Sequence, residues 1–109
     1  MGLFSRKRSA ESEVPVDDPT SGCTAIGSVV TREHVRLCGQ VLGIRVRPSD
    51  TLPAYVARLG DDSGSITIVW NGRRSVGGVG LGKRLLVEGT PVSSPDGLCI
   101  YNPVYTLLP

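Results

Sequence analysis

The feature that most constrains this chain is a slip in the alternation of apolar residues within residues 35–47. Apolar side chains fall at odd positions up to Val41 and at even positions from Ile44 onward. Alternation of this kind predicts a β-strand with one buried face, and a one-residue slip is typical of a β-bulge. Gly39 and Gly43 supply the backbone freedom that a bulge needs. We therefore predict one long strand, bent near these two glycines, which can take part in two sheets at once.

Four further segments show strand patterns, and turn residues separate them. The 109 residues include 14 Gly and 8 Pro, which favours short strands joined by tight turns over a helical bundle. The predicted strands are residues 54–60, 65–70, 84–90 and 98–107, the last one broken at Pro103. Residues 24–30 predict one short helical turn that packs Ile26 inward. Together these elements predict an all-β fold, a five-stranded antiparallel OB-fold barrel with a short N-terminal helical turn.

The start of the chain differs in character from the rest. Residues 1–21 are polar and lack periodicity, which predicts a flexible tail before a single domain at residues 22–109. The tail carries a basic triplet, Arg6, Lys7 and Arg8, followed by acidic residues and two prolines. The triplet could touch phosphate, but we favour a solvated start of the chain.

Cysteine content and hydropathy exclude several classes of protein. Cys23, Cys38 and Cys99 form no C-x-x-C pair and His34 is the single histidine, so we predict no metal site. We interpret the cysteines as reduced thiols in a cytoplasmic protein, with Cys38 and Cys99 in or near the core. No apolar run approaches the ~20 residues of a membrane-spanning helix, so we expect no membrane partner.

The nearest approach to a catalytic motif is residues 77–84, GGVGLGKR, which fits most of the phosphate-binding pattern G-x-x-x-x-G-K-S/T. That pattern needs Ser or Thr after the lysine to hold magnesium, and Arg84 stands there instead. It also needs a following helix, whereas the next residues predict a strand. Asp61 and Asp62 fit a hairpin turn better than an acid-base pair, because adjacent side chains diverge. We therefore predict no enzymatic activity and no cofactor.

Four segments occur in an order that resembles a known family: VRLCGQV from Val35, DDSGSITIVW from Asp61, LGKRLLVEGT from Leu81 and IYNPVY from Ile100. The chain resembles small actinobacterial proteins that consist of one OB-fold nucleic-acid-binding domain. It is similar also to the wedge domain of RecG-type branched-DNA helicases. The resemblance covers about residues 22–109 and departs from the wedge domains at Asn102, where they commonly carry histidine. It implies nucleic-acid binding without unwinding, because the helicase motor is missing.

The resemblance and the strand phases together predict a binding face. OB barrels bind ligands on the outer face of the second and third strands and on the flanking loops. Arginine makes up ten of the 12 basic residues and suits phosphate contacts. The predicted nucleic-acid-binding set is Arg45, Arg47, Arg58, Thr67, Val69, Asn71, Arg73 and Arg74. The predicted ligand is single-stranded or branched DNA, favoured over RNA, bound with weak sequence selectivity.

Two observations favour an alternative function, a protein-interaction module that recruits a protein partner. The net charge is only +2, and aromatic residues, on which single-strand binders stack bases, are scarce. Tyr55 and Trp70 fall in phase with the core side of their strands, and for Trp70 we favour core packing over base stacking. For Tyr101 and Tyr105, on the last predicted strand, the pattern leaves both interpretations open.

Overall fold

The structure is a computed structural model that describes residues 22–48, 52–95 and 97–109. The predicted flexible tail lies outside these residues. The elements are a 3₁₀ turn and seven strands: η1 (Ile26–Ser28), β3 (Val35–Arg47), β4 (Ala54–Asp61), β5 (Gly64–Asn71), β6 (Arg84–Gly89), β7 (Val92–Ser94), β8 (Gly97–Tyr101) and β9 (Val104–Leu107). The all-β prediction is confirmed. Over the described ranges, no helix is long and apolar enough to cross a membrane.

The strands form one mixed sheet in the order β7-β8-β5-β4-β3-β6-β9. β5 and β8 pair in parallel, and the other pairs are antiparallel. The structure therefore does not show the predicted closed barrel of five antiparallel strands. The prediction lacked β7 and treated β8 and β9 as one strand, and the hydrogen-bonded order of the described strands is open.

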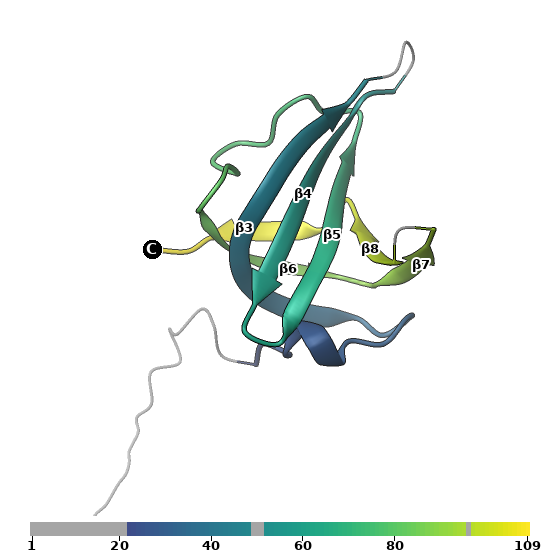
Figure 1. Cartoon of the computed structure of the whole chain (residues 1–109), viewed down its shortest axis with the longest axis vertical. Helices are drawn as coiled ribbons and strands as arrows, with labels where there is room; N and C mark the ends of the chain where they lie inside the picture. Colours follow the sequence, from purple (N-terminus) through teal and green to yellow (C-terminus); the bar gives the residue numbers. More distant parts are fainter. Residues whose placement is uncertain (1–21, 49–51, 96) are drawn as a thin grey trace, which may run out of the picture.

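The last predicted strand divides at Asn102 and Pro103 for local reasons. Asn102 has a φ of 53°, a left-handed conformation that Asn tolerates better than most residues. Pro103 has no N–H to give to a strand ladder. The chain turns here, so β8 pairs with β5 while β9 pairs with β6. Figure 1 shows β3, β4 and β5 in front of β6 and β9, because the sheet curls back on itself.

Strand β3 has the predicted bounds and the predicted bulge. Its register with β4 shifts between Val41 and Gly43. Its first half pairs with β6 and its second half with β4, and Gln40 belongs to both ladders. The bend at the bulge lets this one strand run from the front layer of the sheet to the back layer.

The core lies between the two layers that the curl creates. Leu37, Ile68 and Leu85 are completely buried there. Trp70 is 5% exposed, and its ring centroid lies 6.3 Å from that of Tyr55 and 5.7 Å from that of Tyr105. The prediction that Trp70 packs in the core is confirmed. Its Nε1 has no hydrogen-bond partner among the described residues.

The glycine-rich connection between β5 and β6 packs against this core. Val76 and Val79 in the connection are buried. The Tyr55 hydroxyl donates a hydrogen bond of 2.7 Å to the carbonyl oxygen of Val79, and the Tyr105 hydroxyl donates one of 2.9 Å to that of Gly77. Strand β6 follows directly, as the sequence predicts, so no helix N-terminus faces the glycines.

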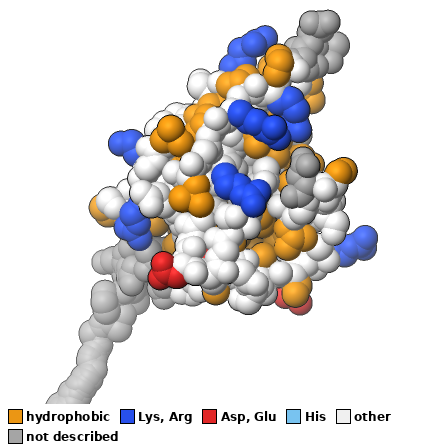
Figure 2. Space-filling view, viewed as in Figure 1, with side chains coloured by type: hydrophobic (Ala, Val, Ile, Leu, Met, Phe, Trp, Pro, Cys, Tyr) orange, Lys and Arg blue, Asp and Glu red, His pale blue; other side chains and the backbone are white. Residues whose placement is uncertain are grey.

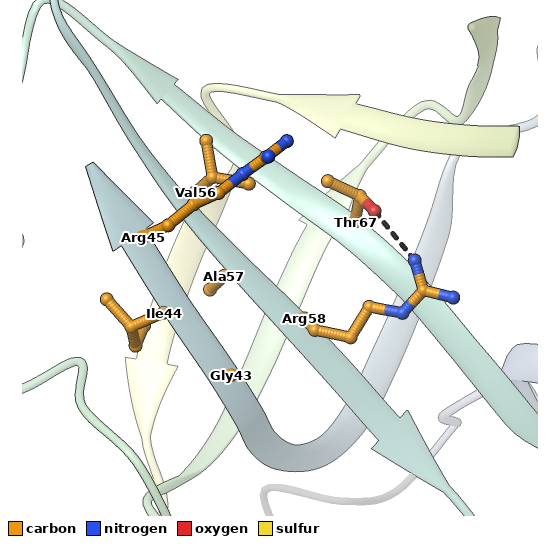
Figure 3. Close-up of a pocket in the computed structure, with 7 residues that line it drawn as sticks. All are labelled: Gly43, Ile44, Arg45, Val56, Ala57, Arg58 and Thr67. Atoms are coloured by element: carbon orange, nitrogen blue, oxygen red, sulfur yellow. Dashed lines mark hydrogen bonds between the residues drawn. The ribbon is translucent and has the colours of Figure 1, made fainter. Parts of the chain in front are cut away.

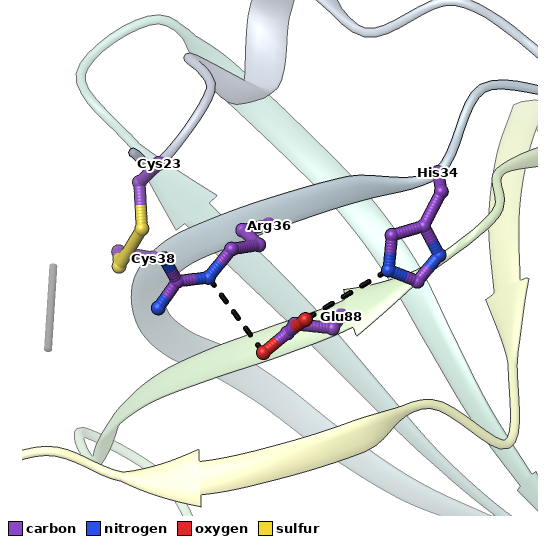
Figure 4. Close-up of polar contacts among 5 residues, drawn as sticks. All are labelled: Cys23, His34, Arg36, Cys38 and Glu88. Atoms are coloured by element: carbon purple, nitrogen blue, oxygen red, sulfur yellow. Dashed lines mark ion pairs between the residues drawn. A yellow bond between two sulfur atoms is a disulfide. The ribbon is translucent and has the colours of Figure 1, made fainter. Parts of the chain in front are cut away.

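Cys23 and Cys38 form a disulfide, with their Cα atoms 6.1 Å apart (Figure 4). This bond contradicts the predicted reduced thiols at these two positions, whereas Cys99 is free and buried, as predicted. The two sulfurs meet because the segment before η1 runs beside β3, where the Thr24 N–H donates to the Arg36 carbonyl oxygen at 2.8 Å.

Candidate functional site

The candidate site is the outer surface of β3, β4 and β5, which we call the arginine face. The strand register arranges its side chains in rows across the sheet. The rows are Arg47, Ala54 and Asn71; Arg45, Val56, Val69 and Tyr101; and Gly43, Arg58, Thr67 and Cys99. Alternation along each strand sends the intervening residues, such as Ile68, to the core.

A hollow of about 460 Å³ opens on the arginine face (Figure 3). Its lining residues are Gly43, Ile44, Arg45, Val56, Ala57, Arg58 and Thr67. Three of them, Arg45, Arg58 and Thr67, belong to the predicted binding set. In Figure 3 the Arg45 side chain extends past Val56, and the Arg58 side chain reaches toward Thr67 on β5. The hollow therefore combines the positive charge of Arg45 and Arg58 with an aliphatic floor, which the Val56 side chain provides.

Hydroxyl groups, rather than a carboxylate, hold the Arg58 guanidinium. Its Nε donates to Ser65 Oγ at 3.0 Å, and its Nη1 donates to Thr67 Oγ1 at 3.1 Å. Across the described residues, no carboxylate lies within ion-pairing distance of Arg45 or Arg58. Within the described part of the chain, the charges of Arg45 and Arg58 are therefore not neutralised by a carboxylate.

A carboxylate that does pair with basic side chains lies elsewhere, on β6. Glu88 lies 3.6 Å from the Nε of Arg36 and 3.8 Å from the Nε2 of His34 (Figure 4). Arg36 lies near the start of β3, where that strand pairs with β6, and His34 lies just before it. The bend in β3 thus separates an acidic position from the arginine face.

The other predicted site residues lie at different depths. Val69 is on the arginine face but is 2% exposed and clusters with two neighbouring apolar residues, so it supports the surface from below. Arg47 is exposed at the end of β3, and Asn71 is exposed at the end of β5. Arg73 and Arg74 are exposed in the connection after β5 and do not line the hollow.

Tyr101 is a candidate site residue that the sequence pattern left undecided. It pairs in register with Val69 on the arginine face and is 44% exposed. Its hydroxyl has no hydrogen bond to any described residue, unlike the hydroxyls of Tyr55 and Tyr105. The signal in the sequence is Ile100, because a core side chain at that position turns the next one outward. Tyr101 thus adds an accessible aromatic ring.

The distribution of side chains over the surface agrees with this description. In Figure 2 basic and hydrophobic side chains mingle over the front strands, and acidic side chains are visible only toward the lower margin. In the part of the chain that the structure describes, no group of three His, Cys, Asp or Glu side chains could hold a metal ion.

Comparison with protein-family models and with curated proteins finds no match to this chain.

Proposed function

We propose that this protein is an OB-type barrel that binds nucleic acid through the arginine face, without catalysis or a cofactor. The observation that carries the proposal is the set of arginines around the hollow, which have no carboxylate partner among the described residues. Guanidinium groups bind phosphate through paired donors and stack on bases. The preferred ligand is single-stranded or branched DNA, bound with weak sequence selectivity.

The path of the last two strands supports the OB-type barrel. β8 pairs with β5 in the front layer, and β9 pairs with β6 in the back layer. Only Asn102 and Pro103 separate β8 from β9 in the chain. The covalent chain therefore links the front layer at β5 to the back layer at β6, as the closure of a barrel requires. The resemblance noted from the sequence points to the same fold.

The modest net charge sets the expected strength of binding. A net charge of +2 gives weak long-range attraction, so contacts at the arginine face must supply most of the affinity. Contacts to phosphate release counterions, so affinity falls as salt concentration rises. We expect weak, strongly salt-dependent binding that differs little between sequences.

Fluorescence anisotropy with a labelled single DNA strand, at low and high salt, tests the proposal. The double variant Arg45→Gln/Arg58→Gln should weaken binding and reduce the slope of log K against log salt by ~1.4, about 0.7 for each phosphate contact. The matched control is Lys83→Gln/Arg84→Gln, which removes two charges at the start of β6. If both double variants weakened binding equally, the arginine face would not be the binding surface. Absence of binding at low salt would overturn the proposal.

One observation favours a protein partner as the second candidate function. Strand β9 ends the hydrogen-bonded order of the sheet, and its Val104 is 71% exposed. An edge strand with exposed apolar side chains can accept a strand from another protein. If no oligonucleotide binds, this edge is where a partner should be sought.

A further inference from the structure

We propose that the hollow over Gly43 is a pocket for one unpaired nucleobase, so that the arginine face binds single strands and rejects duplex. This inference rests on the proposed function and specifies which part of the nucleic acid, a single unpaired base, binds in the hollow. Three observations carry it: the open space above Gly43, the fixed guanidinium of Arg58, and the aliphatic floor.

The space exists because a glycine occupies one position of the β3–β4 ladder. Gly43 pairs in register with Arg58, directly after the bulge. A Cβ atom added to Gly43 would meet no heavy atom within 4 Å. The resulting hollow of about 460 Å³ falls in the ~300–1,000 Å³ range of small-ligand pockets. Any larger side chain at position 43 would occupy it.

The orientation of Arg58 is set before a ligand arrives. The hydrogen bond to Ser65 uses the single N–H of Nε, and the hydrogen bond to Thr67 uses one of the two N–H groups of Nη1. Three of the five guanidinium N–H groups remain for a ligand. A side chain that is already ordered loses less conformational freedom on binding. Arg58 therefore offers a fixed planar group at the edge of the hollow.

The floor of the hollow distinguishes a base from a bare phosphate. Val56 lines the hollow with an aliphatic side chain, and Ala57, whose side chain belongs to the core, lines it with the backbone of β4. A phosphate gains nothing from such surfaces, whereas a nucleobase has apolar faces to bury and a polar edge to pair. Bases in duplex are stacked on both faces and paired at that edge, so a base must be unpaired to enter.

The experiment compares a labelled single strand of about 12 nucleotides with a strand of equal length made of abasic sites, and with duplex. The two single strands carry the same phosphates. The wild-type protein should bind the strand with bases more tightly than the abasic strand. Gly43→Val should reduce this preference by about 5- to 150-fold, which corresponds to about 1–3 kcal/mol for the one base that the hollow receives, while binding the abasic strand as the wild type does.

Two further variants keep the test decisive. Gly80→Val is the matched control, because a Cβ atom at Gly80 also meets no heavy atom within 4 Å and Gly80 does not line the hollow. It should bind as the wild type does. Arg58→Lys retains the charge but not the planar donor group, so it should also lose the preference for bases. This variant replaces Gly43→Val if circular dichroism shows that Gly43→Val is unfolded.

The possible results separate the two proposals. If the wild-type protein binds both single strands equally and Gly43→Val changes nothing, the base pocket is wrong and phosphate binding by the arginine face stands. If duplex binds as tightly as the single strand, the base pocket is also wrong. If no strand binds at low salt, the proposed function fails together with this inference.

Discussion

Asp61 and Ile26 are 35 residues apart in the sequence, yet the Asp61 Oδ2 accepts a hydrogen bond of 3.0 Å from the Ile26 N–H. The Asp61 Oδ1 accepts three more, from the N–H and the hydroxyl of Ser63 and from the N–H of Gly64. One carboxylate thus shapes the β4–β5 turn and fastens η1 to it. Slight burial acts to raise the pKa of Asp61, but the hydrogen bonds from Ile26, Ser63 and Gly64 outweigh it and lower the pKa below 3.8.

The lowered pKa of Asp61 makes stability depend on pH in acid. The carboxylate stabilises the folded state above its unfolded pKa, and this contribution is lost as pH falls through the lower folded pKa. Asp61→Asn should therefore be less stable than the wild type at neutral pH, and the difference should shrink below about pH 4. Thermal unfolding of both proteins from neutral to acid pH measures this difference in stability, and Asp62→Asn serves as the control. A difference that stays constant over that range would contradict this role.

The Cys23–Cys38 disulfide should contribute to stability. It closes a loop with a sequence separation of 15, for which the chain-entropy model gives about 3 kcal/mol. Reduction, or Cys23→Ser, should lower the free energy of unfolding by about that amount in urea titrations. Reductant should have no further effect on Cys23→Ser. Thiol counting on the untreated protein provides a direct check, since only Cys99 should react after unfolding. Three reactive thiols would contradict the pairing.

The buried position of Trp70 predicts a loss of stability on truncation. Trp70→Ala should cost about 3–5 kcal/mol in urea unfolding, because it leaves a cavity between Tyr55 and Tyr105. Trp70→Phe should cost less, since it keeps an aromatic ring and removes a buried N–H that has no partner among the described residues. A well-folded Trp70→Ala that had lost only oligonucleotide binding would show that the ring acts on the ligand.

The exposed ring of Tyr101 should act on the ligand rather than on the fold. Tyr101→Ala should weaken binding to a single strand by ~1–3 kcal/mol and leave the melting temperature nearly unchanged. Tyr101→Phe should bind normally, because the hydroxyl has no hydrogen bond to any described residue. Anisotropy titrations and thermal melts of both variants decide the matter. A large drop in melting temperature for Tyr101→Ala would indicate a structural role instead.

Arg73 and Arg74 should contribute less than the arginines around the hollow. They lie in an exposed connection, so Arg73→Ala/Arg74→Ala should keep the fold and weaken binding about equally for different sequences. The slope of log K against log salt should fall by less than the ~1.4 expected for the Arg45/Arg58 pair. In parallel titrations, Arg6→Ala/Arg8→Ala should have a smaller effect. If Arg6→Ala/Arg8→Ala weakened binding more than Arg73→Ala/Arg74→Ala, the main binding surface would not be the arginine face.

Much of the local structure could be predicted because its causes are local. The alternation around Val41 and Gly43 predicts both the strand β3 and its bulge, since side chains in a strand point to opposite faces in turn. Alternation of the same kind along β5 places Trp70 in the core. The turn after Asp61 follows from residue types that favour tight turns.

The candidate site could be predicted only in part. Strand phase places Arg45, Arg58 and Thr67 on one face, and these three line the hollow. It does not reveal that Val69 is covered, because coverage depends on side chains of neighbouring strands. It also does not reveal the gap at Gly43, which requires the register between β3 and β4.

The sequence by itself determined the strands β3, β4, β5 and β6, the bend in β3 and the core position of Trp70, because each of these depends on residues a few positions apart. Only the tertiary structure decided the contacts that join distant segments. The Cys23–Cys38 bond, the clasp of Asp61 on Ile26 and the parallel pairing of β8 with β5 all arise this way. Such contacts depend on how the curled sheet brings strands together in space, and no short-range pattern in the sequence encodes that distance.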